Sequence, residues 1–303
     1  MPHRKFPSLN LTDQWNAAIA QLVVIILVSC GWTVALADTS VWVATSGATK
    51  VYLGGTVHLL RPGDYPLPEE YNQAYADSER LFFETDVSSM NDMSVQATML
   101  QQLTYSDSRT LKTVLTEEAY EALAGHLATV GMPIMMMEKF KPGLVVSTLQ
   151  LLEFQKLGFT PQGVDVYFNN RALGDAKSVG ELESVQAQIN YIANMGEGNE
   201  SEFILLSLSD LEEISSSMEG LIAAWREGDI QALAELFVDD MRLESEELYN
   251  SLLLERNQNW LPIIEQMFKE DGNEFVLVGA AHLVGDDGLL SLLEAKGYQI
   301  EQL

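Results

Sequence analysis

Two histidines near opposite ends of the chain lie in the same local frame. His58 follows the apolar run Val-Tyr-Leu-Gly-Gly-Thr-Val, and His282 follows Phe-Val-Leu-Val-Gly-Ala-Ala. Each run predicts a buried strand, with glycine near its end and the histidine just beyond its carboxyl end. Open α/β sheets bind ligands at that edge. Since imidazole can ligate a metal or move a proton near neutral pH, the repeated Gly-x-x-His frame predicts one shared site rather than two unrelated turns.

A glutamate follows another predicted strand. Residues 81–86 read Leu-Phe-Phe-Glu-Thr-Asp, which places Glu84 near the carboxyl end of that strand. Two histidines and one carboxylate form a known ligand set for catalytic zinc, with one position open for water. His58, Glu84 and His282 are therefore predicted metal ligands. Without a metal, the same side chains could act as a base and its orienting carboxylate.

Arg256 and Asn257 are further candidates, and both fall within a long predicted helix over residues 245–269. There the guanidinium of Arg256 could clamp a carboxylate or a developing oxyanion. Alternatively, it could remain in water on the polar face of the helix. Four other polar residues are predicted to have structural roles such as helix capping and buried ion pairs: Asp165, Lys177, Glu183 and Gln188.

The predicted strands lie mainly towards the two ends of the chain. They cover residues 41–45, 51–57, 81–86, 178–182, 275–282 and 298–302. If the terminal strands pair in one sheet, the first and last thirds of the chain complete a single domain and bring the two histidines together. The predicted fold is α/β, bordering on α+β, with a mixed central sheet built from N- and C-terminal strands and a large helical middle section. In that section, residues 133–141 are expected to form a helix whose three methionines pack in the core.

Composition limits the partners of this domain. The chain has 303 residues, a hydrophobic content of 47% and a formal net charge of −27 at pH 7. Such a length allows one large domain with an ample core. The acidic charge argues against nucleic acid and anionic membranes as partners. Because Cys30 is the only cysteine, the domain that follows it has neither a disulfide nor a thiol nucleophile.

Residues 1–37 have the pattern of a signal peptide. A basic start precedes an apolar run over residues 17–28, and small residues at the end of the segment fit a cleavage site. The sequence therefore predicts that the domain over residues 38–303 is exported to the periplasm or the cell exterior without inserting into a membrane. Two alternatives remain open, a lipoprotein anchored through Cys30 and an uncleaved anchor over residues 17–37.

These motifs together resemble those of the TraB/GumN family, which includes the Tiki-type metalloproteases. The resemblance covers roughly residues 41–302. It rests on Gly55-Thr-Val-His58, Glu84 in Phe-Phe-Glu-Thr-Asp, Lys141-Pro142, Gly163-Val-Asp165, Lys177, Leu182-Glu183, Gln188, Glu255-Arg256-Asn257, and Gly279-Ala-Ala-His282-Leu with Gly285 and Gly288-Leu-Leu. The resemblance implies an α/β domain with both Gly-x-x-His motifs at one site. Tiki-like members are proposed to use a divalent metal, so the resemblance implies either a Zn, Mn or Co ion at the site or a site that works without metal.

Carried over residue by residue, the resemblance implies that His58, Glu84 and His282 form the core of the site and that Arg256 and Asn257 support it. The first hypothesis is an exported hydrolase, foremost a metal-dependent peptidase acting on a peptide or small molecule. A variant of this first hypothesis is a metal-independent hydrolase that uses histidine and glutamate and is similar to the erythromycin esterases. The second hypothesis is a non-catalytic exported binding or accessory protein on the same fold. The two histidines and Glu84 favour the first, because a binding module does not need them.

Overall fold

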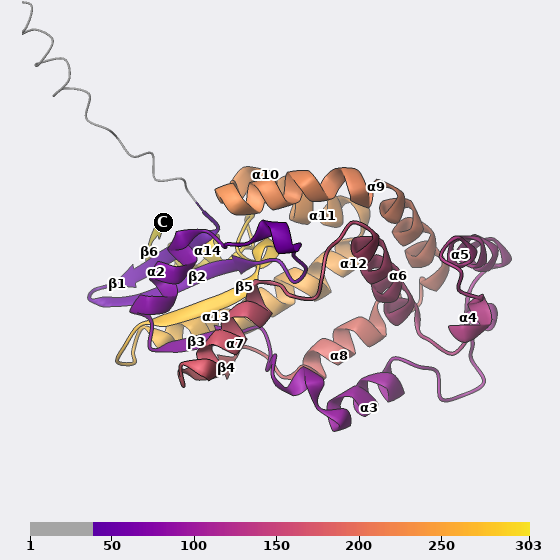
Figure 1. Ribbon diagram of the computed structural model, residues 1–303, viewed down its shortest axis with the longest axis horizontal. Helices are drawn as coiled ribbons and strands as arrows, with labels where there is room; N and C mark the ends of the chain where they lie inside the picture. The colour runs from indigo at the N-terminus through magenta and orange to yellow at the C-terminus, as the bar shows by residue number, and fades with distance from the viewer. Residues whose placement is uncertain (1–38) are drawn as a thin grey trace, which may run out of the picture. The chain divides into compact units, whose positions relative to one another are not determined.

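The computed structural model describes residues 39–303, apart from the side chains of residues 212–216, and centres on a six-stranded mixed sheet (Figure 1). The strand order is β4-β3-β5-β2-β1-β6. The strands are β1 (Val41–Ser46), β2 (Thr49–Thr56), β3 (Arg80–Phe83), β4 (Ser178–Glu181), β5 (Glu274–Gly279) and β6 (Gln299–Gln302). Strands β4, β3, β5 and β2 are parallel, whereas β1 pairs antiparallel with both of its neighbours. This confirms the α/β prediction and the mixed sheet.

Strand β5 takes the central place between β3 and β2, although it comes from the C-terminal part of the chain. Its sequence is apolar almost throughout, and the strand is buried along nearly its whole length. A strand covered on both faces has this continuous apolar character. The prediction that strands from the two ends of the chain pair in one sheet is therefore confirmed.

Helices cover both faces of the sheet, and the connections explain which helix lies on which face. Helices α2 (Glu69–Asp77) and α7 (Val164–Gly174) share one face, where the rings of Tyr71 and Phe168 both contact Phe275 of β5. The later connections cross the sheet in the opposite direction. Because such crossovers are right-handed, they put α13 (Glu255–Met267) and α14 (Leu289–Ala295) on the other face. The direction of winding thus reverses at β5.

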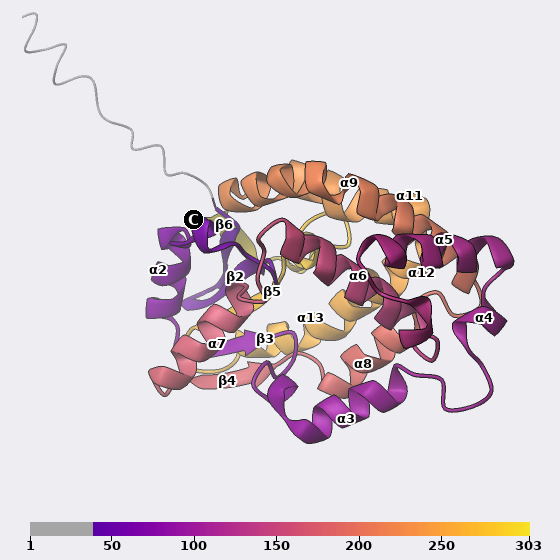
Figure 2. The same ribbon diagram turned by 45° about the vertical axis from the view of Figure 1, so that its right-hand side comes forward.

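The middle of the chain is helical, as predicted. Its helices are α3 (Met93–Gln102), α4 (Leu111–Val114), α5 (Glu117–Thr129), α6 (Pro142–Lys156), α8 (Val185–Asn194), α9 (Glu200–Glu227), α10 (Ile230–Ala234), α11 (Asp240–Glu244) and α12 (Glu246–Tyr249). Helix α9 packs against α5 and α6 (Figure 2), and these elements share a second hydrophobic cluster apart from the one around the sheet. Two π-helical segments, Glu235–Asp239 and Asn250–Leu254, interrupt the later helices.

The methionine-rich segment differs from its prediction. Residues 133–141 form only a short 3₁₀ turn, Ile134–Met136, rather than a helix that packs into the core. Met135 and Met136 are 82% and 68% exposed, whereas Met137 is buried. Consecutive residues of a tight turn point in different directions, so only one of the three methionines reaches the core.

No helix within residues 39–303 is both long enough and apolar enough to cross a membrane. The predicted signal peptide, its cleavage site and the possible lipid anchor at Cys30 lie outside the described residues.

Candidate functional site

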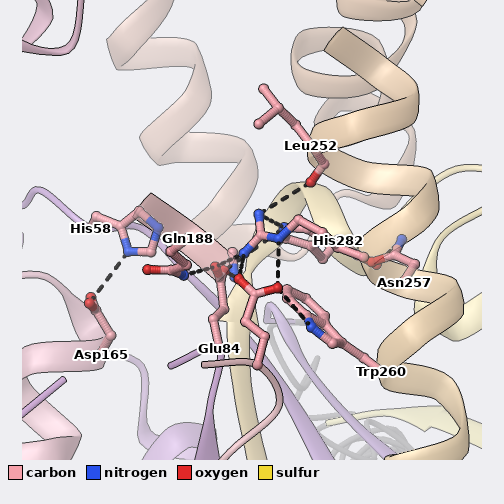
Figure 3. Close-up of polar contacts among 11 residues, drawn as sticks. His58, Glu84, Asp165, Gln188, Leu252, Asn257, Trp260 and His282 are labelled. Atoms are coloured by element: carbon pink, nitrogen blue, oxygen red, sulfur yellow. Dashed lines mark hydrogen bonds and ion pairs between the residues drawn. The ribbon is translucent and has the colours of Figure 1, made fainter. Parts of the chain in front are cut away.

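The three predicted core residues lie at the carboxyl ends of three neighbouring parallel strands. His58 follows β2, Glu84 follows β3 directly, and His282 ends the 3₁₀ turn Ala280–His282 after β5. All three line one cavity of about 290 Å³ together with Arg256. Figure 3 shows Glu84 between the two histidines. Because the sheet reverses its winding at β5, a crevice is expected at this edge, where α/β sheets bind ligands.

The glycines of the two Gly-x-x-His frames allow this convergence. A Cβ on Gly55 would lie only 3.2 Å from Cβ of Ala280, so the first frame packs directly against the second. A Cβ on Gly279 would lie 3.2 Å from Oε1 of Glu84. The backbone N–H of Gly279 donates a hydrogen bond to the same Glu84 oxygen at 2.8 Å. Close approach of a neighbouring atom, rather than backbone conformation, therefore favours glycine at both positions.

Arg256 is buried at the centre of the site and pairs with two carboxylates. Its Nη2 donates to Glu84 Oε2 at 2.6 Å and to Glu183 Oε1 at 2.7 Å. Its Nε donates to Glu183 Oε2, and its Nη1 donates to the carbonyl of Leu252 and to His282 Nε2. The Leu252 carbonyl belongs to the π-helical segment Asn250–Leu254. Arg256 is only 8% exposed, so the alternative of a solvated surface arginine is wrong.

These contacts use all five N–H groups of the guanidinium. Arg256 therefore clamps carboxylates, as one sequence-based interpretation expected. In this arrangement it has no donor left for an oxyanion. Glu183 and Gln188, which were expected to have structural roles, belong to the same network, because Gln188 Nε2 also donates to Glu84 Oε2 at 3.2 Å.

His282 is held as a neutral imidazole. A guanidinium can only donate, so His282 Nε2 accepts from Arg256 Nη1 at 3.0 Å. The proton then lies on Nδ1, which donates to Asn257 Oδ1 at 2.7 Å. The amide of Asn257 in turn donates to the carbonyls of His282 and Asp287. Asn257 thus fixes the turn and the tautomer of His282.

Burial and neighbouring charges set the pKa values of His282 and Glu84, two of the groups that contact Arg256. Burial lowers the pKa of His282 to about 3, so its ring stays neutral. Burial alone would raise the pKa of Glu84, but the positive charge of Arg256, together with His282, His58 and the Gly279 N–H, outweighs it and holds that pKa well below its ordinary value. The centre of the site is therefore an ionised carboxylate, a guanidinium and a neutral imidazole.

His58 lies on the other side of Glu84 and pairs with Asp165. Its Nδ1 is 3.4 Å from Asp165 Oδ2, and its Nε2 forms no hydrogen bond with any residue that the structure describes. The negative charge of Asp165 raises the pKa of His58, although solvent around the imidazole, which is 61% exposed, screens this attraction. Asp165 was expected to have a structural role such as capping or a buried ion pair, and it lies in an ion pair with His58.

The start of helix α7 brings Asp165 to His58. A Cβ on Gly163 would lie 2.4 Å from the carbonyl oxygens of His58 and Val57. The N–H of Val164 donates to the same Val57 carbonyl at 3.1 Å. Glycine at position 163 therefore lets the helix dock on the backbone that carries His58, and Asp165 follows in the first helical turn.

Replacing Gly163 with alanine is expected to push α7 away from His58. The overlap is with backbone, which cannot rotate aside, so we expect a loss of about 1–3 kcal/mol in the free energy of unfolding. Denaturant unfolding measures this loss. Gly174→Ala at the other end of the same helix is the control, because a Cβ there meets no atom within 4 Å. Equal stability of the two variants would contradict the docking argument.

The predicted metal ligands do not face a common free point in this arrangement. His282 Nε2 and Glu84 Oε2 are both occupied by Arg256, and Glu84 Oε1 is occupied by the Gly279 N–H. No group of three histidine, cysteine, aspartate or glutamate side chains within the described part of the chain could hold a metal ion. A divalent metal at His58, Glu84 and His282 would require Arg256 to leave. In the described arrangement the cation in contact with Glu84 is the guanidinium of Arg256.

Comparison with known proteins places this chain in a family. The model of the TraB/PrgY/gumN family matches residues 40–302. The chain is also 24% identical over 304 aligned residues to a protein of Danio rerio named Metalloprotease TIKI2, covering 82% of this chain and 58% of that protein. It thus spans somewhat more than half of that relative. No solved structure matches the chain. Since the family match extends over nearly all the described residues, including both Gly-x-x-His frames and the arginine between them, this chain belongs to the TraB/PrgY/gumN family.

Proposed function

We propose that this protein is an exported hydrolase of peptide bonds in which His58 is the general base. The observation that carries the proposal is the pair of His58 and Asp165, which together with Glu84 line one cavity of about 610 Å³. Asp165 would hold the Nδ1 proton, which leaves the Nε2 lone pair to take a proton from water. The carboxylate of Glu84 would stabilise the imidazolium that forms, because its negative charge favours protonated His58.

Arg256 and Asn257 would act as positioning residues. Arg256 holds the Glu84 carboxylate in its ionised form, and Asn257 holds the turn that ends at His282. Peptide hydrolysis is supported by the name of the TIKI2 relative, which is a metalloprotease. That name also supports a second candidate, a metal-dependent peptidase.

Hydrolysis of a peptide library is expected to persist after exhaustive chelation, because His58 would activate water directly. Purified protein is incubated with the library with and without chelator, and products are read by mass spectrometry. Loss of hydrolysis on chelation, with recovery on adding Zn²⁺, Mn²⁺ or Co²⁺, would instead support the metal-dependent peptidase. Absence of hydrolysis under every condition would favour a binding or accessory protein.

Export is the second part of the proposal, and it rests on the pattern of residues 1–37. Cell fractionation is expected to recover the protein outside the cytoplasm. Mass spectrometry of its N-terminus would distinguish cleavage before Asp38 from a lipidated Cys30. A full-length protein found in the soluble cytoplasmic fraction would contradict export.

A further inference from the structure

Two cavities of different character meet at the proposed base. The cavity of about 290 Å³ described above and a larger cavity of about 610 Å³ share Thr56, His58, Leu59 and Glu84. Building on the proposed function, we infer that the site selects substrates with an apolar side chain on one side of the reacting bond and an ammonium group on the other.

The smaller cavity, here called the apolar cavity, is lined mostly by hydrocarbon and aromatic groups. Phe154 comes from α6, Met218 and Leu221 come from α9, and Phe237 comes from the π-helical segment Glu235–Asp239. Beside them lie the small residues that follow β5. Such a surface gains free energy by removing an apolar side chain from water.

Three residues that line the larger cavity, here called the polar cavity, carry buried oxygens without partners. The hydroxyls of Thr56 and Thr85 and Oδ1 of Asp165 form no hydrogen bond within the described residues. Thr56 is 3% exposed and Thr85 is 5% exposed. All three residues line this cavity. Since buried polar groups are nearly always hydrogen-bonded, several unpartnered oxygens around one cavity point to the polar group of a ligand.

The charges around the polar cavity indicate which polar group fits. Asp165 and Glu84 line it, and none of its described lining residues is a lysine or an arginine. Arg256 pairs with Glu84 as well as with Glu183, whereas the charge of Asp165 is balanced only when His58 is protonated. When His58 acts as a neutral base, a carboxylate oxygen and two hydroxyls remain as acceptors. An ammonium has three donors and the complementary charge, whereas a substrate carboxylate would be repelled.

An ammonium could come from the free N-terminus of a peptide or from a lysine side chain. The experiment therefore compares three matched peptides with the same apolar residue: one with a free N-terminus, its N-acetylated form, and an N-acetylated form carrying lysine. We expect kcat/KM to be about tenfold higher with an ammonium than without, as for one hydrogen bond between charged groups. The peptide with the highest value identifies the source. Equal values for all three would overturn the inference.

Thr85→Val tests the polar cavity without changing the shape of the side chain. It is expected to remove most of the preference for ammonium and to leave the melting temperature unchanged or raised, because an unpartnered buried hydroxyl is lost. Thr39→Val is the matched control, because the Thr39 hydroxyl is also buried and unpartnered but does not line either cavity. The same loss of preference in both variants would contradict the assignment.

Phe237→Ala tests the apolar cavity by enlarging it. We expect the preferred apolar residue of the substrate to shift towards larger side chains. Leu236→Ala in the same π-helical segment is the control, because Leu236 does not line this cavity. An unchanged preference with Phe237→Ala would overturn this half of the inference.

Binding measured with the His58→Ala variant separates this inference from the proposed hydrolysis. A free-amine peptide is expected to bind about tenfold more tightly than its acetylated form even when turnover is absent. If that difference in affinity holds while the unaltered protein hydrolyses nothing, the ammonium site stands and the proposed function fails. If peptides are hydrolysed without any such difference, the ammonium site fails and the hydrolase stands.

Discussion

Replacing Arg256 with alanine is expected to destabilise the protein by about 3–5 kcal/mol, because two buried carboxylates lose their shared cation. The side chains of Glu84 and Glu183 are 10% and 8% exposed, and both accept hydrogen bonds from Arg256 Nη2. Removing the guanidinium also leaves His282 Nε2 without its donor. Denaturant unfolding of the purified variant measures the loss.

The loss of stability should depend on pH. In the unaltered protein the pKa of Glu84 lies below the ordinary 4.5, so this residue contributes stability above that pH and the contribution is lost as pH falls. Without Arg256, burial would instead raise the pKa of Glu84, and the variant would lose stability as pH rises above 4.5. The difference between the two proteins should therefore be largest near about pH 8 and smaller near about pH 5.

Arg109→Ala is a suitable control for Arg256→Ala. Arg109 also pairs with a carboxylate, that of Asp107, but both side chains are about half exposed. Its loss should change the free energy of unfolding by no more than about 0.5 kcal/mol. An Arg256→Ala variant as stable as the Arg109→Ala variant would mean that the buried pairs do not hold the site together.

Replacing His58 with alanine is expected to lower turnover by about 10²–10⁴-fold, the usual contribution of a general base. Stability should change little, because the imidazole is 61% exposed. Steady-state kinetics on a cleaved peptide and thermal unfolding measure the two effects. A His58→Ala variant with undiminished turnover would rule out His58 as the base.

Asp165→Asn should change how turnover depends on pH. Only neutral His58 can accept a proton, so kcat/KM should rise with pH through the pKa of His58, which Asp165 raises above the ordinary 6.5. Without the charge of Asp165, the rise in kcat/KM should move to lower pH. The maximum rate should also fall, because the His58 ring is less well oriented. Asp175→Asn at the end of α7 is the control, because Asp175 contacts Tyr75 rather than His58. An unchanged pH profile with Asp165→Asn would contradict the pairing.

The strands and the meeting of His58, Glu84 and His282 could be predicted from local sequence. Strand β5 is a continuous apolar run, and each of the three residues follows a strand. Parallel strands place their carboxyl ends at one edge, so the position of each residue after its strand was enough to bring the three together.

The contacts of Arg256 and Asp165 could not be predicted in the same way. Arg256 lies on a helix far from Glu84 in the sequence. Trp260 and Ile264, one and two turns further on, mark the inward face of α13, but they do not show which side chains Arg256 meets there. Asp165 reaches His58 only because Gly163 allows two backbone segments to touch, and that contact depends on tertiary packing. The glycine before Asp165 was the one available signal, and it also suits an ordinary helix start.

The position of β5 has a consequence for the order in which the protein is completed. Strands β2 and β3 are synthesised long before β5, yet they pair with it rather than with each other. A nascent chain that stops before Glu274 would expose two unpaired strand edges and lack both His282 and the backbone donor to Glu84. Such long-range pairing makes folding slow. The site would therefore remain incomplete until β5 and the turn that ends at His282 have emerged, and the proposed hydrolysis could begin only then.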